Sequence, residues 1–232
     1  MKSQRISVGI LAANWLKFEE TLSILSNNQI NLLHVDIADG QFSPLFTVGS
    51  SAIKQLSGNF YKDVHLLVNR QEKHAKQAVK CGADMVTLQL ESDRDLHDIL
   101  AWLNTQYIVT NGINRPVLSG LSLCPETDLS LLQPYWDRID LIQLLTLDPR
   151  TGVKADEFSI LTRIKSVMNM LGEKRAGKII TVDGSMTLDL AIKAKRLGID
   201  RVVSGSVLFA DTDLDGTLMR WKTELLAVES AV

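Results

Sequence analysis

Several features that would assign this chain of 232 residues to a specialised class are missing from it. Cysteine occurs only twice, as Cys81 and Cys124, and these two residues are far apart and lack CxxC spacing. Neither a disulfide framework nor a thiolate zinc site is therefore indicated, and the composition fits a reducing cytoplasm.

An excess of charge of one sign is also missing. The chain has 25 Lys and Arg against 27 Asp and Glu, a formal net charge of −2, and these residues are dispersed along it. No basic stripe indicates nucleic acid, and no cluster indicates an anionic membrane surface. The apolar part of the N-terminal MKSQRISVGIL is too short for a secretion signal, and no run approaches the length of a membrane span. We expect a soluble, cytoplasmic protein with no nucleic-acid or membrane partner.

No stretch rich in proline, glycine or serine marks a linker between domains, and no low-complexity segment is present. With 45% hydrophobic residues, the chain can bury a substantial core. We therefore expect residues 1–232 to form one domain.

Short apolar runs alternate with segments of helical spacing along the chain. The expected strands cover 5–11, 31–37, 61–68, 84–90, 117–123, 138–145, 178–183 and 200–204. The expected helices cover a segment after the N-cap Asn14, then 48–57, 71–81, 94–104, 126–134, 156–171, 187–197 and 212–228. Between them, residues 105–116 contain an Asn-Gly turn and predict an inserted loop or hairpin.

Eight strand–helix units in this length predict an α/β fold, a (β/α)₈ TIM barrel. An open doubly wound sheet is the competitor, but no GxGxxG follows the first strand. Polar residues instead recur at the ends of several strands, which is where barrel active sites form.

The stretch Asn31–Gly40 (NLLHVDIADG) places two such residues in a strand that is otherwise apolar. Because strand side chains alternate, His34 and Asp36 share one face. His65 on the next strand and Asp183 at the end of a later strand complete a set of two imidazoles and two carboxylates. Such a set suits one divalent cation, zinc, manganese or iron.

The motifs HVDIADGQF with its following S and P, DVHLL, VDGS and SGSVLF resemble the ribulose-phosphate 3-epimerase family along nearly the whole chain. The resemblance implies a ribulose-phosphate-binding barrel that inverts C3 of D-ribulose 5-phosphate to give D-xylulose 5-phosphate. It also implies that His34, Asp36, His65 and Asp183 bind the metal, with Asp36 and Asp183 as the acid/base pair. A homo-oligomer is expected from the family alone.

The implied chemistry agrees with the residues. Inverting a carbon beside a ketone requires proton removal on one face and return on the other, through an enediolate that a cation stabilises. Loops after the last two strands fall where many barrels bind phosphate. The expected phosphate contacts are Gly184, Ser185, Gly205 and Ser206.

The chain departs from the family pattern around the sugar. The serine of the first strand is Gly9, and a histidine of the fourth strand in many members is Gln89. The glycine-rich loop after the sixth strand reads Asp148–Lys154, where Arg150 or Lys154 could supply charge to a phosphate. Three family methionines are replaced by Ala38, Leu67 and Leu145. A changed substrate follows more readily than lost chemistry, so a six-carbon ketose phosphate such as allulose 6-phosphate is the alternative to ribulose 5-phosphate.

Two other functions compete with the epimerase. A barrel lyase of the decarboxylase type would need a catalytic lysine near the end of strand two or three, whereas Lys62 begins strand three. A non-catalytic sugar-phosphate-binding barrel is the other possibility, although four buried polar ligands would be costly to keep without a use.

Overall fold

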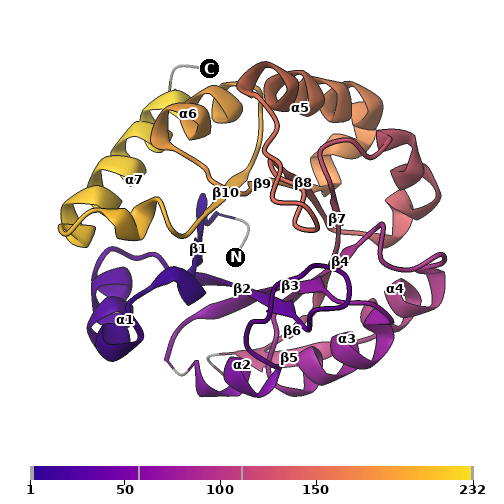
Figure 1. The fold of residues 1–232 in the computed structure, drawn as a ribbon, viewed down its shortest axis with the longest axis horizontal. Coiled ribbons are helices and arrows are strands. Elements are labelled where there is room, and N and C mark those ends of the chain that lie inside the picture. The colour runs from indigo at the N-terminus through magenta and orange to yellow at the C-terminus, as the bar shows by residue number, and fades with distance from the viewer. Residues whose placement is uncertain (1–2, 57, 111, 231–232) are drawn as a thin grey trace.

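The fold is a closed barrel of eight parallel strands surrounded by helices (Figure 1). The computed structural model describes residues 3–56, 58–110 and 112–230. The barrel strands are β1 (Ile6–Gly9), β2 (Leu32–Ala38), β3 (Tyr61–Leu67), β4 (Met85–Gln89), β7 (Leu118–Leu123), β8 (Leu141–Leu145), β9 (Ile179–Asp183) and β10 (Arg201–Ser204). The first strand closes the ring, because it pairs with β10 on one side and with β2 on the other. The predicted (β/α)₈ barrel is thus confirmed.

Helices follow the strands as the periodicity predicts. They are α1 (Phe18–Asn27), α2 (Ser51–Gln55), α3 (Gln71–Lys80), α4 (His97–Leu103), α5 (Glu157–Leu171), α6 (Leu188–Arg196) and α7 (Leu214–Ser230). Side-chain caps begin several helical segments: Asn14 accepts from the backbone N–H of Leu16 before a 3₁₀ turn at Trp15–Lys17, and Asp156 caps α5. Gly82 follows α3 with a positive φ of +102°, a conformation that glycine adopts readily and that commonly ends helices.

The helix predicted at 48–57 and the one predicted at 126–134 differ from the structure. The first is reduced to the five residues of α2, and Ser57 lies outside the described residues. The second is a 3₁₀ segment, Leu129–Arg138, that contains Pro134. Proline removes a backbone donor and clashes with the preceding turn of an α-helix, which accounts for the 3₁₀ geometry. Further 3₁₀ turns lie at Ile10–Ala12, Gly172–Gly177 and Leu208–Ala210.

The segment between α4 and β7 forms an antiparallel hairpin outside the barrel. Its strands are β5 (Tyr107–Thr110) and β6 (Ile113–Pro116), with Thr110 opposite Ile113. The expected Asn-Gly turn includes Asn111, which lies outside the described residues.

The inside of the barrel is divided into an apolar and a polar zone. Five buried side chains, Leu32, Met85, Leu118, Leu141 and Ile179, form a cluster at the beginnings of their strands. Farther along the strands the buried positions become polar, with Ser7, His34, Asp63, His65, Thr87, Gln89, Gln143 and Thr181. Burying so many polar groups is favourable only if they are paired, so their partners define the site.

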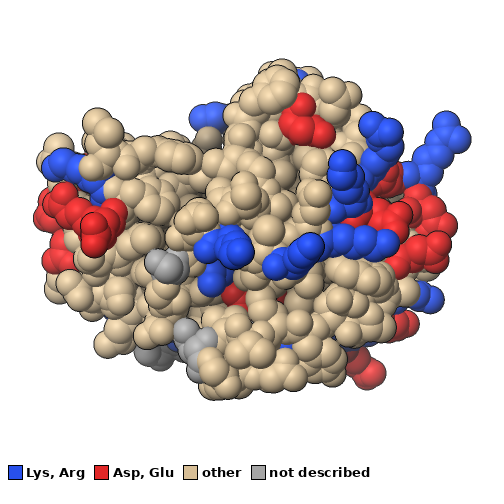
Figure 2. Space-filling model, turned by 90° about the horizontal axis from the view of Figure 1, so that it is seen from below, with Lys and Arg blue, Asp and Glu red and all other residues tan. Residues whose placement is uncertain are grey.

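None of the helices in the described ranges is long and apolar enough to cross a membrane. On the face shown in Figure 2, acidic and basic side chains lie together at both ends of the view, among wide uncharged areas. No continuous patch of one sign covers that face.

Candidate metal centre and active site

The register of β2 against β3 brings the polar residues of the two strands together. His34 lies opposite Asp63, and Asp36 lies opposite His65. All four side chains have the alternation phase that faces the barrel interior. His34, Asp63 and His65 are almost completely buried, whereas the side chain of Asp36 is 36% exposed at the mouth of the barrel.

The Asp63 carboxylate orients the imidazole of His34. Its Oδ2 lies 3.1 Å from Nδ1 of His34 and also accepts from the hydroxyl of Ser7 at 3.0 Å. An ionised carboxylate only accepts hydrogen bonds, so Nδ1 carries the proton. The other nitrogen, Nε2, is buried without a hydrogen-bond partner in the described protein. It lies 3.3 Å from Asp36 Oδ1 and 3.6 Å from Asp183 Oδ2.

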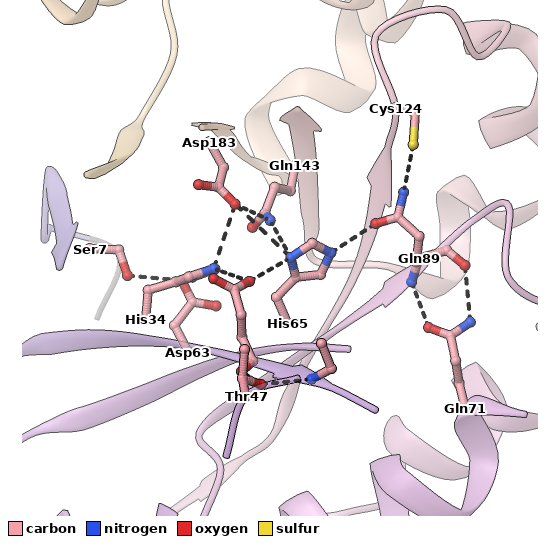
Figure 3. A network of polar contacts seen from close by, with 12 residues as sticks. Ser7, His34, Thr47, Asp63, His65, Gln71, Gln89, Cys124, Gln143 and Asp183 are labelled. Carbon is pink, nitrogen blue, oxygen red and sulfur yellow. Dashed lines mark hydrogen bonds and ion pairs between the residues drawn. The ribbon is translucent and has the colours of Figure 1, made fainter. Parts of the chain in front are cut away.

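His65 has a different set of neighbours. Its Nε2 lies 2.8 Å from Oε1 of Gln89, and its Nδ1 lies 3.1 Å from Asp36 Oδ1 and 4.0 Å from Asp183 Oδ2. The amide nitrogen of Gln143 lies 3.2 Å from the same Nδ1 and donates to Asp183 Oδ2 at 2.9 Å. Figure 3 shows Asp183, Gln143 and His65 pointing toward one another from different strands.

Four potential ligand atoms thus converge at one point. One atom each from His34, Asp36, His65 and Asp183 lies within 4.8 Å of the other three. Two imidazole nitrogens and two carboxylate oxygens facing one another repel unless protons or a cation lie between them. The residues therefore fit a divalent cation of the type that nitrogen and oxygen ligands bind, zinc, manganese or iron.

The charges of the cluster change the pKa values of its members. Burial lowers the pKa of His34, but the carboxylates of Asp36 and Asp63 outweigh it and hold that pKa well above the ordinary value. Burial raises the pKa of both aspartates, yet the His34 imidazole beside them holds it below the usual range. Burial raises the pKa of Asp183 to about 6, helped by the negative charge of Asp36. The two carboxylates of the cluster therefore differ in proton affinity.

The predicted phosphate residues lie in two loops at the same end of the barrel. Gly184 and Ser185 follow β9, and Gly205 and Ser206 follow β10. The hydroxyl of Ser204 donates to the carbonyl of Met186 at 3.2 Å, which ties the two loops together.

Both loop glycines are close to other atoms. Gly184 has φ of +108°, and a Cβ there would lie 2.8 Å from Thr146 Oγ1. A Cβ on Gly205 would lie 2.9 Å from the carbonyl oxygen of Gly9. The positive φ of Gly184 and the close packing at both glycines leave these two positions little freedom to accept a side chain.

In the loop after β8, the charge of Arg150 is paired with the carboxylate of Asp148 in the same loop. The guanidinium of Arg150 binds Asp148 through two nitrogens, at 2.9 Å from Nε to Oδ1 and 2.6 Å from Nη2 to Oδ2. It also lies over the ring of Phe42, 5.8 Å from the ring centre. Its contact with a phosphate would therefore compete with the Asp148 pair.

The sequence alone gave no role to Ser7, Asp63 or Gln143, and it identified Gln89 only as a departure from the family pattern. Gln143 had a usable signal, because it is the one polar residue in the run LIQLL and shares the phase of Leu141 and Leu145. The contacts of Ser7 with Asp63 depend on two strands that are far apart in the sequence.

Residues 5–209 match the model of the "Ribulose-phosphate 3 epimerase family". The chain belongs to this family. One relative, named "Putative epimerase LsrE", from Salmonella paratyphi A, is 43% identical over 222 residues, which are 96% of this chain and 87% of the relative. The ribulose-phosphate 3-epimerase of Bacillus subtilis is 26% identical over 212 residues, 90% of this chain and 94% of the relative. The protein is thus an isomerase of the epimerase class.

Solved structures of other barrel enzymes share the fold. The orotidine 5′-phosphate decarboxylase of Lactobacillus acidophilus superimposes with a TM-score of 0.66 at 15% identity, covering 96% of this chain and 99% of the decarboxylase. At this identity the likeness concerns the fold alone.

Proposed function

We propose that this epimerase is a divalent-metal-dependent 3-epimerase of a ketose phosphate, with D-ribulose 5-phosphate as the default substrate and D-xylulose 5-phosphate as its product. The observation that carries the proposal is the convergence of one ligand atom each from His34, Asp36, His65 and Asp183 within 4.8 Å of one another. The cluster lies inside β2 and β3 and at the carboxyl end of β9, and Asp36 opens to the end of the barrel where active sites of (β/α)₈ barrels form.

Asp36 and Asp183 are the proposed proton-transfer residues. They are the carboxylates of the cluster and come from different strands, so they can reach the two faces of a sugar bound between them. One removes the proton from C3, and the other returns a proton to the opposite face; the roles exchange in the reverse reaction. Their unequal pKa values fit a pair in which one carboxyl holds a proton while the other is ionised.

A cation held by His34, Asp36, His65 and Asp183 would supply electrostatic stabilisation of the negative charge that develops on the oxygens beside C3. The chain's own contribution is to fix the ligands. Asp63 fixes the orientation of the His34 ring, and Gln143 donates a hydrogen bond to Asp183. Both ligands are therefore already oriented toward the cluster in the absence of substrate.

The phosphate of the substrate is proposed to bind at Gly184, Ser185, Gly205 and Ser206. Backbone N–H groups of tight loops at this end of a barrel are suited to an anion. The contact between the two loops through Ser204 keeps them at a fixed separation, which supports binding of one phosphate by both.

A six-carbon ketose phosphate such as allulose 6-phosphate is the second candidate. Ala38 is smaller than the methionine that the family pattern has there, and it lies at the end of β2 two residues after Asp36. A smaller residue near the cluster leaves room for a longer sugar. Gly9 adds no such room, because a Cβ there would lie 3.1 Å from Cα of Gly205. The lyase alternative lacks such support, since Lys62 is at the amino end of β3, where its backbone N–H binds Asp84.

Proton exchange at C3 is the direct test. The protein loaded with Zn²⁺, Mn²⁺ or Fe²⁺ is incubated in deuterated water with ribulose 5-phosphate and, separately, with allulose 6-phosphate, and loss of the C3 proton is followed by NMR. Exchange with either sugar is expected, and the preferred sugar identifies the substrate.

Two aspartate variants make this test specific. Asp183→Asn is expected to lower the exchange rate by about 10²–10⁴-fold, the usual size of an acid–base contribution. Asp39→Asn, the same substitution just beyond β2 and outside the cluster, is expected to leave exchange within threefold of the wild type, about 0.6 kcal/mol or less. Equal exchange in wild type and Asp183→Asn would contradict the proposed role.

A further inference from the structure

Gln89, the last residue of β4, connects His65 to the carboxylate of Glu91. Its Oε1 lies 2.8 Å from His65 Nε2, and its Nε2 lies 2.5 Å from Glu91 Oε2. Figure 3 shows the Gln89 amide between His65 and Cys124. Because Gln89 and His65 are both buried, protein groups rather than bulk water decide how this amide is turned.

The backbone of Gln89 is held in place by Gln71. The Gln71 amide accepts from the backbone N–H of Gln89 at 2.6 Å and donates to its carbonyl at 3.0 Å (Figure 3). With the main chain fixed, the Gln89 amide can still rotate by about 180°, which exchanges its oxygen and nitrogen. The two orientations present opposite hydrogen-bonding groups to His65.

Glu91 permits only one of these orientations. An ionised carboxylate accepts hydrogen bonds and cannot donate, so the amide NH₂ of Gln89 must face Glu91. The other oxygen of Glu91 accepts from the backbone N–H of Cys124 at 2.8 Å and from the hydroxyl of Thr127, which fixes the carboxylate.

Cys124 does not determine the orientation. Its sulfur lies 3.4 Å from the Gln89 amide nitrogen. Burial raises the pKa of the Cys124 thiol to about 12, so the sulfur keeps its proton at neutral pH. A thiol is both a weak donor and a weak acceptor, and it can therefore accommodate either end of the amide.

The amide orientation determines the tautomer of His65. With Oε1 of Gln89 facing it, Nε2 of His65 carries the proton and donates. In the neutral ring, which is the form that binds a cation, the lone pair is then on Nδ1, the nitrogen that faces Asp36, Asp183 and the amide nitrogen of Gln143. If the amide were reversed, its NH₂ would require a lone pair on Nε2, and Nδ1 could not be the ligand of a cation in the neutral ring.

We propose that Glu91 is a positioning residue that orients the Gln89 amide and thereby selects the His65 tautomer that binds the metal through Nδ1. The inference rests on the metal site of the proposed function, and it assigns to Glu91 and Gln89 the task that Asp63 performs for His34. Partners of ligating imidazoles typically change metal affinity by about 10–100-fold when they are altered.

Glu91→Gln is the informative substitution. The new side chain has the same shape, and its oxygen remains opposite the backbone N–H of Cys124, so its NH₂ faces Gln89. The Gln89 amide must then reverse and present its own NH₂ to His65. We expect Zn²⁺ affinity to fall by about 10–100-fold. Glu91→Ala removes the acceptor, so the Gln89 amide can adopt either orientation. We expect it to lower Zn²⁺ affinity less than Glu91→Gln does.

A second substitution should restore the tautomer. In Gln89→Glu combined with Glu91→Gln, the residue at position 89 accepts on both sides, from His65 Nε2–H and from the NH₂ at position 91. We expect Zn²⁺ affinity within about threefold of the wild type, a difference of about 0.6 kcal/mol. Glu126→Gln, which removes the charge of an exposed neighbour, is the matched control and should change nothing.

Zn²⁺ affinity is measured by competition with a chelator, and the protonated ring nitrogen of His65 is identified by ¹H–¹⁵N NMR of the zinc-loaded protein. A wild type that binds no Zn²⁺ at these residues would reject the metal site itself. A wild type that binds, with Glu91→Gln binding equally well, would overturn only the role of Glu91. If Glu91→Gln does not fold, the test is the double variant Gln89→Glu with Glu91→Gln. Zn²⁺ binding by it close to that of the wild type supports the role of Glu91, and weak Zn²⁺ binding contradicts it.

Discussion

The two histidines of the metal centre are held by chemically different partners. His34 donates to Asp63, a carboxylate that accepts in any orientation, whereas His65 faces Gln89, an amide with an accepting end and a donating end. The Asp63 carboxylate alone therefore determines which ring nitrogen of His34 carries the proton. The tautomer of His65 depends in addition on Glu91, which determines how the amide of Gln89 is turned.

The difference affects charge as well as orientation. Asp63 brings a negative charge next to His34 and raises the pKa of that imidazole, in addition to the effect of Asp36. Gln89 is neutral and contributes a dipole only. We expect His34 to respond to changes in charge around it and His65 to respond to changes in hydrogen-bond direction.

The largest effect is expected for Asp63→Asn. The amide oxygen can still accept from His34 and Ser7, but the negative charge is lost, so the pKa of His34 in the metal-free protein should fall toward its ordinary value. Because the ring becomes a weaker base, Zn²⁺ affinity should fall by about 10–100-fold. An NMR titration of the ring and chelator competition measure the two changes.

Asp84→Asn is the matched control for this substitution. Asp84 is equally buried but precedes β4 at the other end of the barrel, where it accepts from the backbone of Lys62 and from Thr110. It should lower stability without changing Zn²⁺ affinity. A pKa of His34 that stays high in Asp63→Asn would show that Asp36 alone raises it.

The pH dependence of metal binding is expected to be the next effect in size. Asp183, with a pKa of about 6, and His34, with a pKa above the ordinary value, both hold protons that a cation must displace. Affinity should therefore rise with pH, and below pH 6 it should fall by roughly tenfold or more per pH unit as protons compete.

Chelator competition between pH 5 and 8, with proton release measured by calorimetry in buffers of different ionisation enthalpy, checks this dependence. Affinity that is constant from pH 5 to 7 would mean that neither group carries a displaceable proton.

Ser7→Ala should have the smallest effect. It removes one hydrogen bond to Asp63, at 3.0 Å, while the carboxylate keeps its contact with His34. A single buried hydrogen bond contributes about 0.5–1.5 kcal/mol, which corresponds to a loss of Zn²⁺ affinity of about twofold to roughly tenfold at most.

Ser119→Ala is a suitable comparison, because Ser119 is also buried on a barrel strand but bonds to Asn104 and the carbonyl of Arg138. Its removal should affect stability and leave metal binding unchanged. If Zn²⁺ affinity fell equally in Ser7→Ala and Ser119→Ala, the loss would be due to general destabilisation and not to the hydrogen bond with Asp63.

Much of the barrel could be predicted from the sequence, because strands and helices alternate with clear periods and turn residues separate them. Alternation within β2 was enough to place His34 and Asp36 on one face. The segment at 129–138 could not be predicted as well, since Pro134 disfavours a regular α-helix there but does not specify the 3₁₀ geometry that the structure shows.

The partners of the ligands could not be predicted from the sequence. Alternation gives the face of each side chain but not the register between strands, and the register decides that His34 lies opposite Asp63 and Asp36 opposite His65. The link from Glu91 through Gln89 to His65 depends on which end of the Gln89 amide faces His65. No pattern of residue types specifies that orientation.

The most direct test of the metal centre is a crystal structure of the protein with Zn²⁺ or Mn²⁺, with anomalous scattering used to locate the ion. We predict one ion bound by His34 Nε2, His65 Nδ1 and a carboxylate oxygen each of Asp36 and Asp183. An ion located elsewhere, or bound through Nε2 of His65, would contradict the account.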